Sequence, residues 1–341
     1  MMKKLTMTLM SILMLTALFT VSCKKSVAAQ AAVTEEKAAP LKIGITKIVA
    51  HPALDALEQG AMEVILETYP DAQFDNQNAN GDMNTASSIA QKFKADKVDL
   101  AIGIATPTAQ ALANTLKDIP VLYSAVTDPV DAGLVDSYDQ GGMNVTGISD
   151  MTPVKDQIKL LMSLTEVKTL GHIYTSSEAN AVTLANMAKE ASAELGIDFI
   201  ETTVTNSSEV KQAAQAIVDK VDAIYISTDN TVVAALSGVS DVATRKGIPI
   251  MSADPTSAYD NEVLVAWGFD YYKMGKACGR MAVEVLQGKK TSDIPTGFMT
   301  SVEDIDLLIN MDLAEKLGIS IPGDLEAKAG TLIKNGEVVK Q

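Results

Sequence analysis

Two threonines follow an apolar segment at the point where a helix is expected to begin. Residues 99–105 are almost wholly apolar, as expected of a strand buried on both faces of a parallel sheet. The chain then turns at Thr106-Pro107-Thr108, and we expect Thr106 to cap the following helix and Pro107 to occupy its first position. An open helix N-terminus flanked by two hydroxyls is typical of an anion-binding site.

A similar arrangement recurs later in the chain. Residues 90–99 (AQKFKADKVD) resemble residues 214–222 (AQAIVDKVD), and each segment is followed by an apolar strand and a polar turn. In this alignment Thr106 corresponds to Asp229. Hydroxyls at a helix N-terminus suit a carboxylate, whereas a fixed negative charge suits an ammonium. The pair therefore favours a zwitterionic ligand over a sugar or a phosphate.

Further polar residues follow other predicted strands. Ser124 ends one strand, Ser177 and Asn180 begin a helix in the second half, and Asp254 precedes a proline. Asp254 competes with Asp229 for the ammonium, although an Asp-Pro turn or simple helix capping would also explain these residues. The candidate ligand-binding residues are Thr106, Thr108, Ser124, Ser177, Asn180, Asp229 and Asp254.

The elements that must position these residues alternate between strand and helix, and the pattern starts twice. The predicted strands of the first set cover 42–48, 71–76, 99–105, 119–125 and 144–149. Those of the second set cover 169–174, 198–204, 222–227 and 248–252. This order predicts an α/β protein with two Rossmann-like lobes and parallel sheets. Ligands of such sheets bind outside the carboxyl ends of the strands, so we expect the site in a cleft between the lobes.

Composition excludes several classes of function. The chain has 341 residues and a formal net charge of −15, which argues against nucleic acid as a partner. Two histidines and two cysteines leave little for a metal site or a disulfide framework. The sequence contains no zinc-protease, nucleophile-elbow, P-loop or dinucleotide motif, and the S-x-x-K segment at Ser208 reads as a helix start. We therefore expect no enzyme activity and no cofactor.

The N-terminus carries export signals. Residues 1–22 have a basic start, an apolar centre and a small-residue end, as in a secretory signal peptide. The cysteine that follows, Cys23, resembles the lipidated cysteine of bacterial lipoproteins, although Thr20 stands where leucine is usual; the alternative is an ordinary cleavage site. Residues 23–40 read as the lipidated cysteine and a flexible tether. An extracytoplasmic protein anchored to a bacterial membrane is expected.

Six separated segments carry a resemblance to a known family. Over residues 41–330 the chain is similar to the ABC-transporter substrate-binding family that includes tryptophan/tyrosine-binding lipoproteins. The matching segments are residues 106–110, 124–129, 144–150, 177–180, 225–230 and 270–272.

The resemblance implies a hinged fold of the periplasmic binding protein type I kind, with the ligand cleft between its lobes. The N-terminal lobe would comprise residues 41–149 and about 270–299, and the C-terminal lobe residues 150–269 and about 300–330. Asp150 and Asp270 would then lie at hinges.

The resemblance also implies capture of a small amino-acid-like ligand, best matched by tryptophan or tyrosine, and delivery to an ABC permease with its ATPase. The aromatic residues that could flank a ligand ring are Tyr123, Tyr174, Tyr225, Trp267, Phe269 and Tyr271. Two alternatives stay open: a ligand-sensing receptor for a signalling partner, and an enzyme with an unrecognised site.

Overall fold

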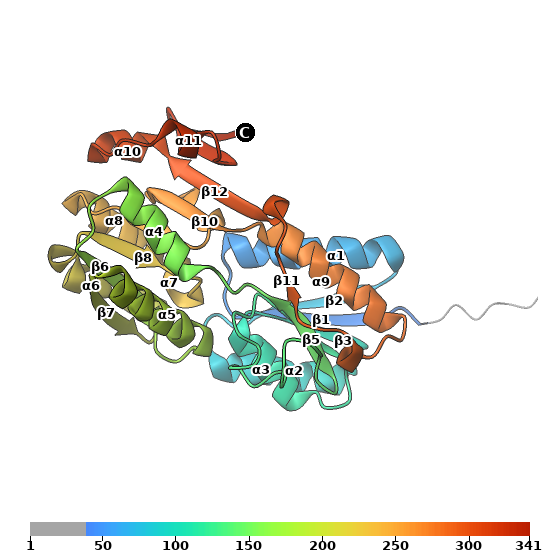
Figure 1. Cartoon of the computed structure of the whole chain (residues 1–341). Coiled ribbons are helices and arrows are strands. Elements are labelled where there is room, and N and C mark those ends of the chain that lie inside the picture. The colour runs from blue at the N-terminus through green and yellow to red at the C-terminus, as the bar shows by residue number, and fades with distance from the viewer. Residues whose placement is uncertain (1–38) are drawn as a thin grey trace, which may run out of the picture. The chain divides into compact units, whose positions relative to one another are not determined.

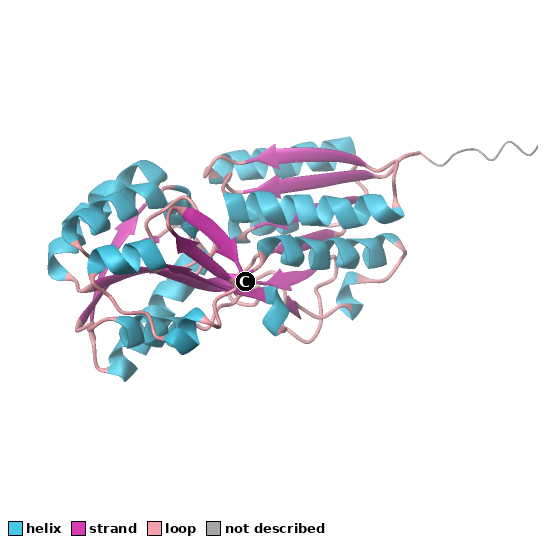
Figure 2. Ribbon diagram, turned by 90° about the horizontal axis from the view of Figure 1, so that it is seen from above, coloured by secondary structure: helices cyan, strands magenta, loops and turns pink. Residues whose placement is uncertain are grey.

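The computed structural model describes residues 39–341, so the expected signal peptide, Cys23 and nearly all of the expected tether lie outside the described residues. Residues 40–341 contain two β-sheets, each with helices on both faces (Figure 2). Within the part that the structure describes, no helix is both long and apolar enough to cross a membrane.

The first sheet is entirely parallel and has the strand order β11-β5-β4-β3-β1-β2. Its strands β3, β4 and β5 are buried along their whole length, which explains their continuous apolar sequences. The strands are β1 (Lys42–Lys47), β2 (Gln73–Asn78), β3 (Leu100–Ile104), β4 (Val121–Ser124), β5 (Val145–Ser149) and β11 (Gly297–Phe298).

Helices α1 (Pro52–Thr68) and α9 (Tyr271–Leu286) lie side by side on one face of this sheet, and α2 (Met83–Asp96) and α3 (Thr106–Thr115) pack on the other (Figure 1). Glycines let the backbones of α1 and α9 touch. A Cβ placed on Gly275 would lie 2.2 Å from the carbonyl oxygen of Leu57. This close approach fixes the two helix N-termini relative to each other, and both N-termini contribute to the pocket described below.

The second sheet has the order β14-β13-β12-β10-β9-β8-β6-β7. Strands β6 to β9 are parallel, as expected, and β10, which was not predicted, is parallel to β9. Strand β12 is antiparallel to β10, and β14 is antiparallel to β13. The strands are β6 (Thr169–Thr175), β7 (Asp198–Val204), β8 (Ala223–Ile226), β9 (Ile250–Ser252), β10 (Val265–Phe269), β12 (Ile305–Asn310), β13 (Thr331–Lys334) and β14 (Glu337–Lys340). Strand β10 leads out toward the first sheet and β12 returns from it, so the two run in opposite directions.

Alternate residues of β8 supply two separate cores. Ala223 and Tyr225 pack in a cluster with α4 and α5, whereas Ile224 and Ile226 pack with α6, α7 and α8 on the other face. The helical segment that follows β8 is interrupted at Ala235, which separates α7 from α8. The helices of this half are α4 (Val154–Leu164), α5 (Ala179–Leu195), α6 (Val210–Ile217), α7 (Asn230–Ala234), α8 (Leu236–Lys246), α10 (Met311–Leu317) and α11 (Gly323–Glu326).

The chain passes between the two sheets three times. The connections run from β5 to α4, from β10 to α9 and from β11 to β12. Each half is therefore built from separated segments of sequence. The second sheet also includes residues 331–340, beyond the end of the expected C-terminal lobe.

Candidate ligand-binding site

A small pocket lies at the carboxyl ends of strands from both sheets, where ligands of open α/β sheets bind. The residues contributed by the first half are His51, Leu54, Ala125, Asp150 and Tyr271. Those contributed by the second half are Asn180, Thr228, Asp229, Asn230, Val233 and Asp254. The pocket volume is about 10 Å³, which is room for about one water molecule.

Helix N-termini and strand ends position these side chains. His51 is the N-cap of α1 and Tyr271 is the first residue of α9, the two helices held together by glycine contacts. Asn180 lies in the first turn of α5, and Asp229 is the N-cap of α7. Helix N-termini from both halves thus supply residues to the same pocket.

Asp254 presents a free carboxylate oxygen to this pocket. Its Oδ1 accepts a hydrogen bond from the backbone N–H of Thr256 at 2.8 Å. Its Oδ2 is buried and has no hydrogen-bond partner among residues 39–341, and the residue is 2% exposed. Burying a charged oxygen without a partner is costly, so this atom is the strongest indication of a ligand that donates a hydrogen bond.

His51 lies across the pocket from Asp254. Burial lowers the pKa of the His51 ring, and the negative charge of Asp254 opposes that shift. His51 is therefore neutral near pH 7 and leaves the Asp254 carboxylate without a cationic neighbour on this side.

Asp150 brings a second carboxylate to the pocket. Its Oδ1 accepts from the Thr127 hydroxyl at 3.2 Å and its Oδ2 from the Tyr271 hydroxyl at 3.3 Å. Burial raises the pKa of Asp150 to about 6; the two hydrogen bonds oppose this rise, and the charge of Asp254 adds to it. Asp150 follows β5 in a connection between the sheets, so the residue expected at a hinge also lines the pocket.

Asp229 uses both of its oxygens within the protein. Its Oδ1 accepts from the backbone N–H of Val232 and the hydroxyl of Thr175, each at 2.9 Å, and its Oδ2 accepts from the backbone N–H of Thr175 at 2.5 Å. Burial raises the pKa of this carboxyl, and the hydrogen bonds oppose that rise. Asp229 therefore caps α7 and ties it to β6, whereas Asp254 keeps an oxygen available.

Glu178 is a buried acid that the sequence analysis missed. It lies behind the pocket, where Asn230 donates to its Oε2 at 2.6 Å and Thr231 to its Oε1 at 2.9 Å. Burial and then the charge of Asp229 raise the pKa of Glu178 to about 7, against the effect of these hydrogen bonds. Its neighbour Ser177, a predicted ligand-binding residue, is exposed and does not line the pocket.

The raised pKa of Glu178 predicts a pH-dependent stability. The folded-state pKa of about 7 exceeds the ordinary value of 4.5, so the folded protein binds the proton more tightly than the unfolded chain. This contribution is present below pH 4.5 and is lost as the pH rises through 7. Glu178→Gln should therefore raise the melting temperature relative to wild type more at pH 8 than at pH 5, by about 2 °C or more.

Differential scanning fluorimetry at the two pH values measures this difference. The matched control is Glu190→Gln, which changes an exposed glutamate of the same helix, α5, and should show the same offset from wild type at both pH values. An equal offset for Glu178→Gln at pH 5 and pH 8 would contradict the assigned pKa shift.

Thr106 and Thr108, which follow strand β3, have different environments. The Thr106 hydroxyl is buried and has no hydrogen-bond partner within the described residues. The Thr108 hydroxyl instead donates to the carbonyl oxygen of Ile104 at 2.6 Å. Neither residue lines the pocket in this structure. Thr106 thus keeps a free hydroxyl at the N-terminus of α3, and Thr108 stabilises the preceding turn.

The turn before α3 differs from the expected geometry. The N-cap is Ala105, not Thr106, and the helix begins at Thr106 itself. Ala105 has a φ of 74°, and Ala125, which follows the neighbouring strand β4, has a φ of 54°. Left-handed conformations at residues other than glycine are unfavourable and concentrate at functional sites. The two strained turns lie at adjacent strand ends beside the pocket.

Several other candidates lie away from the pocket. The Ser124 hydroxyl faces the buried Cys278 thiol, whose pKa is raised to about 12 by burial and lowered slightly by that hydroxyl. Tyr123 and Tyr225 are completely buried and bond to Thr296 and Gln157, respectively. Of the aromatic residues expected to flank a ligand ring, Tyr271 alone is among the described pocket residues.

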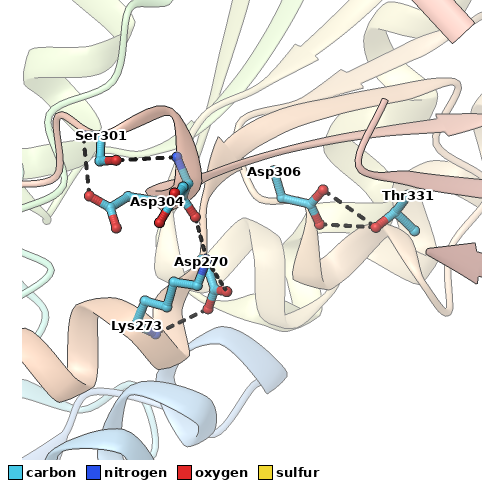
Figure 3. A network of polar contacts seen from close by, with 7 residues as sticks. Asp270, Lys273, Ser301, Asp304, Asp306 and Thr331 are labelled. Carbon is cyan, nitrogen blue, oxygen red and sulfur yellow. Dashed lines mark hydrogen bonds and ion pairs between the residues drawn. The ribbon is translucent and has the colours of Figure 1, made fainter. Parts of the chain in front are cut away.

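Asp270, the second residue expected at a hinge, joins two of the connections between the sheets (Figure 3). Its carboxylate accepts from the backbone N–H of Lys273 at 3.0 Å and so caps α9. Its own backbone N–H donates to the carbonyl oxygen of Asp304 at 2.9 Å, where the third connection ends. Ser301 and Asp304 form a capping box in that connection. This hydrogen bond between Asp270 and Asp304 therefore joins two of the connections about which the two sheets would move relative to each other.

A hydrogen bond also bridges the two halves beside the pocket. The hydroxyl of Thr183 in α5 donates to the carboxylate of Asp131, in the segment after β4, at 2.7 Å. Together with the small pocket volume, this contact shows the two sets of strand ends drawn close together. Within residues 39–341, no three or more histidine, cysteine, aspartate or glutamate side chains are arranged so that they could hold a metal ion.

Comparison with known proteins gives consistent similarities. The family described as ABC transporter substrate binding protein matches residues 42–333. A tyrosine-binding protein of Clostridioides difficile is 39% identical over 280 residues, which cover 81% of this chain and 80% of that protein. A Streptococcus pneumoniae ABC domain in complex with L-Trp is 33% identical, with a TM-score of 0.82 over 86% of this chain and all of that one.

A further solved structure shows a different arrangement. The ligand-free, open structure of a substrate binding protein with adhesive properties from Clostridium difficile is 38% identical. The match covers 83% of this chain and 97% of that protein, with a TM-score of 0.63. At comparable identity and coverage, the present structure is thus more similar to the L-Trp complex than to the open protein.

Proposed function

Because the chain belongs to the ABC transporter substrate binding protein family, we propose that it is the receptor of an importer and captures an aromatic amino acid, tyrosine or tryptophan. The tyrosine-binding relative and the L-Trp complex support this choice of ligand. Members of this family bind substrates, so the chemistry required of the site is recognition and release.

The free oxygen of Asp254 is the observation that carries the proposal. An α-ammonium group would supply the hydrogen bond and the positive charge that this buried oxygen lacks. Asp229 was the first choice for this role on sequence grounds, but its oxygens are already occupied by Thr175 and Val232. We therefore assign the ammonium to Asp254 and a positioning role to Asp229, which holds α7 at the edge of the pocket.

The other parts of the ligand have matching groups nearby. The N-terminus of α3 and the free hydroxyl of Thr106 suit the ligand carboxylate, since a helix N-terminus carries partial positive charge. Leu54, Val233 and Tyr271 give the pocket an apolar part for the aromatic ring. These assignments place the ligand in contact with both halves of the protein.

Binding must involve movement of the two halves. The pocket is small and enclosed by residues of both halves, and the Thr183–Asp131 hydrogen bond links the halves outside the pocket lining. We propose that the halves separate at the connections near Asp150 and Asp270 to admit the ligand. Contacts to both halves then favour the closed arrangement, as a population shift requires.

The remaining roles follow from the family and from the N-terminal sequence. We propose that residues 1–22 direct export, that Cys23 carries a lipid and that residues 24–40 tether the binding unit to the outer side of a bacterial membrane. The ligand would pass from the closed receptor to a membrane permease driven by an ATPase. The receptor itself needs no cofactor for this work.

A thermal-shift screen of the twenty amino acids tests the proposed ligand class. L-Tyrosine or L-tryptophan at 100 times its Kd should stabilise the protein by about 2.7 kcal/mol, which gives a shift of several degrees. Glycine and L-aspartate serve as controls, because the first lacks the ring and the second adds a negative charge to an acidic pocket. No shift with any aromatic amino acid would contradict the proposed ligand.

A further inference from the structure

The charge of Lys47 acts on His51 from outside the lining, where Lys47 is paired with Asp55 and Glu58, whereas the charged residues that line the pocket are all acidic. Asp150, Asp229 and Asp254 line it, and Glu178 lies directly behind it. None of the described residues that line the pocket is lysine or arginine, and the one histidine, His51, is kept neutral by burial. The protein therefore offers buried negative charge to a ligand ammonium but no full positive charge to a ligand carboxylate.

Three buried oxygens of the pocket have no partner among the described residues and can accept a hydrogen bond from a ligand, and the two ring nitrogens of His51 are unpaired as well. Besides Asp254 Oδ2, the buried Oδ1 of Asn180 and Oγ1 of Thr228 have no partner within the part of the chain that the structure describes. Asn180 is 5% exposed, and its amide nitrogen already donates to the carbonyl oxygen of Thr228 at 3.3 Å. An alkylammonium group has three N–H donors and no acceptor, which matches these three oxygens. These three oxygens therefore suit an ammonium group whether or not the ligand also carries a carboxylate.

We propose that this pocket recognises primary arylalkylamines, such as tyramine and tryptamine, as well as the corresponding amino acids. The inference rests on the proposed function, because it concerns the same site. An amine keeps the ring and the ammonium of the amino acid and lacks the carboxylate. Its net positive charge suits an acidic pocket, whereas a zwitterion brings a negative charge into the same acidic surroundings. What the amine forgoes is the interaction with Thr106 and the N-terminus of α3.

Three ligands that differ by one group each test this inference. Isothermal titration calorimetry of the purified protein would compare L-tyrosine, tyramine and 3-(4-hydroxyphenyl)propionate. L-Tyrosine has both charged groups, tyramine has the ammonium alone, and the propionate has the carboxylate alone. We expect tyramine to bind with a Kd within about tenfold of that of tyrosine, and the propionate to show no binding. Asp254→Asn should weaken both tyrosine and tyramine. Thr106→Val should lower the affinity for tyrosine relative to tyramine.

The outcomes separate this inference from the proposed function. Binding of tyrosine without tyramine would overturn the inference and leave the proposed function in place. Binding of tyramine without tyrosine or tryptophan would support the inference and overturn the proposed amino-acid ligand. Binding of the propionate with an affinity similar to that of tyrosine would overturn the inference, because it would show that the carboxylate is the recognised group. If none of the aromatic compounds binds, both proposals are wrong.

Discussion

Asp254→Asn should weaken binding of L-tyrosine or L-tryptophan by at least about 30-fold, because removing one member of a buried charge pair costs about 2–5 kcal/mol. The asparagine keeps the size of the side chain and can still accept from the backbone N–H of Thr256. It removes the negative charge that we assign to the ligand ammonium. Isothermal titration calorimetry measures the affinity, and differential scanning fluorimetry measures the stability of the unliganded protein.

The melting temperature of the unliganded protein distinguishes the role of Asp254 from that of Asp229. Asp254 Oδ2 is buried and unpaired among the described residues, so Asp254→Asn should leave the melting temperature of the unliganded protein unchanged or raise it. Asp229 accepts three hydrogen bonds, so Asp229→Ala should lower that temperature by several degrees through the loss of the cap on α7. An Asp254→Asn protein that binds tyrosine with wild-type affinity would remove Asp254 from the site.

The second large effect is expected at the contact between α1 and α9. Gly275→Val should destabilise the protein by about 3 kcal/mol, because even the Cβ would lie 2.2 Å from the backbone oxygen of Leu57. In an exposed helix interior, replacing a glycine would be neutral or favourable, so the sign of the effect is specific to this contact. The expected fall in melting temperature is about 6 °C or more. Ligand affinity should fall with it, since α1 and α9 position His51 and Tyr271.

The matched control for this prediction is Gly323→Val. Gly323 begins α11, and a Cβ at that position meets no other atom within 4 Å. We expect its melting temperature to stay within about 2 °C of wild type, as for most surface substitutions. Equal melting temperatures for Gly275→Val and Gly323→Val would show that α1 and α9 do not pack as closely as the structure indicates.

Local sequence patterns were sufficient to predict the two-lobed α/β fold. Runs such as residues 99–105 are apolar because both faces of a parallel strand are covered, so they are recognisable without any tertiary information. Strands β10 to β14 were not predicted, and β12 to β14 extend the second sheet from β10 to its edge. Their direction depends on where the chain returns from the first sheet, and no local pattern encodes that return.

A pocket does lie at the predicted strand ends, and its role as the ligand-binding site stays a prediction. Its location at the strand ends follows from topology, and Asn180, Asp229 and Asp254 do line the pocket. Which carboxylate keeps an oxygen without a hydrogen bond depends on partners far away in the sequence. Thr175 donates hydrogen bonds to the Asp229 carboxylate and precedes Asp229 by 54 residues. Tyr123 and Tyr225 are also completely buried. Their rings pack in the hydrophobic cores of the first and second half, respectively, and do not flank the pocket. Such long-range contacts cannot be inferred from spacing.

A crystal structure of the protein grown with L-tyrosine or L-tryptophan tests the central claim most directly. We expect the ligand between the two sets of strand ends, with its ammonium within hydrogen-bond distance of Asp254 and its carboxylate at the N-terminus of α3. Electron density for the amino acid at any other place, or an ammonium bonded elsewhere than to Asp254, would contradict this expectation.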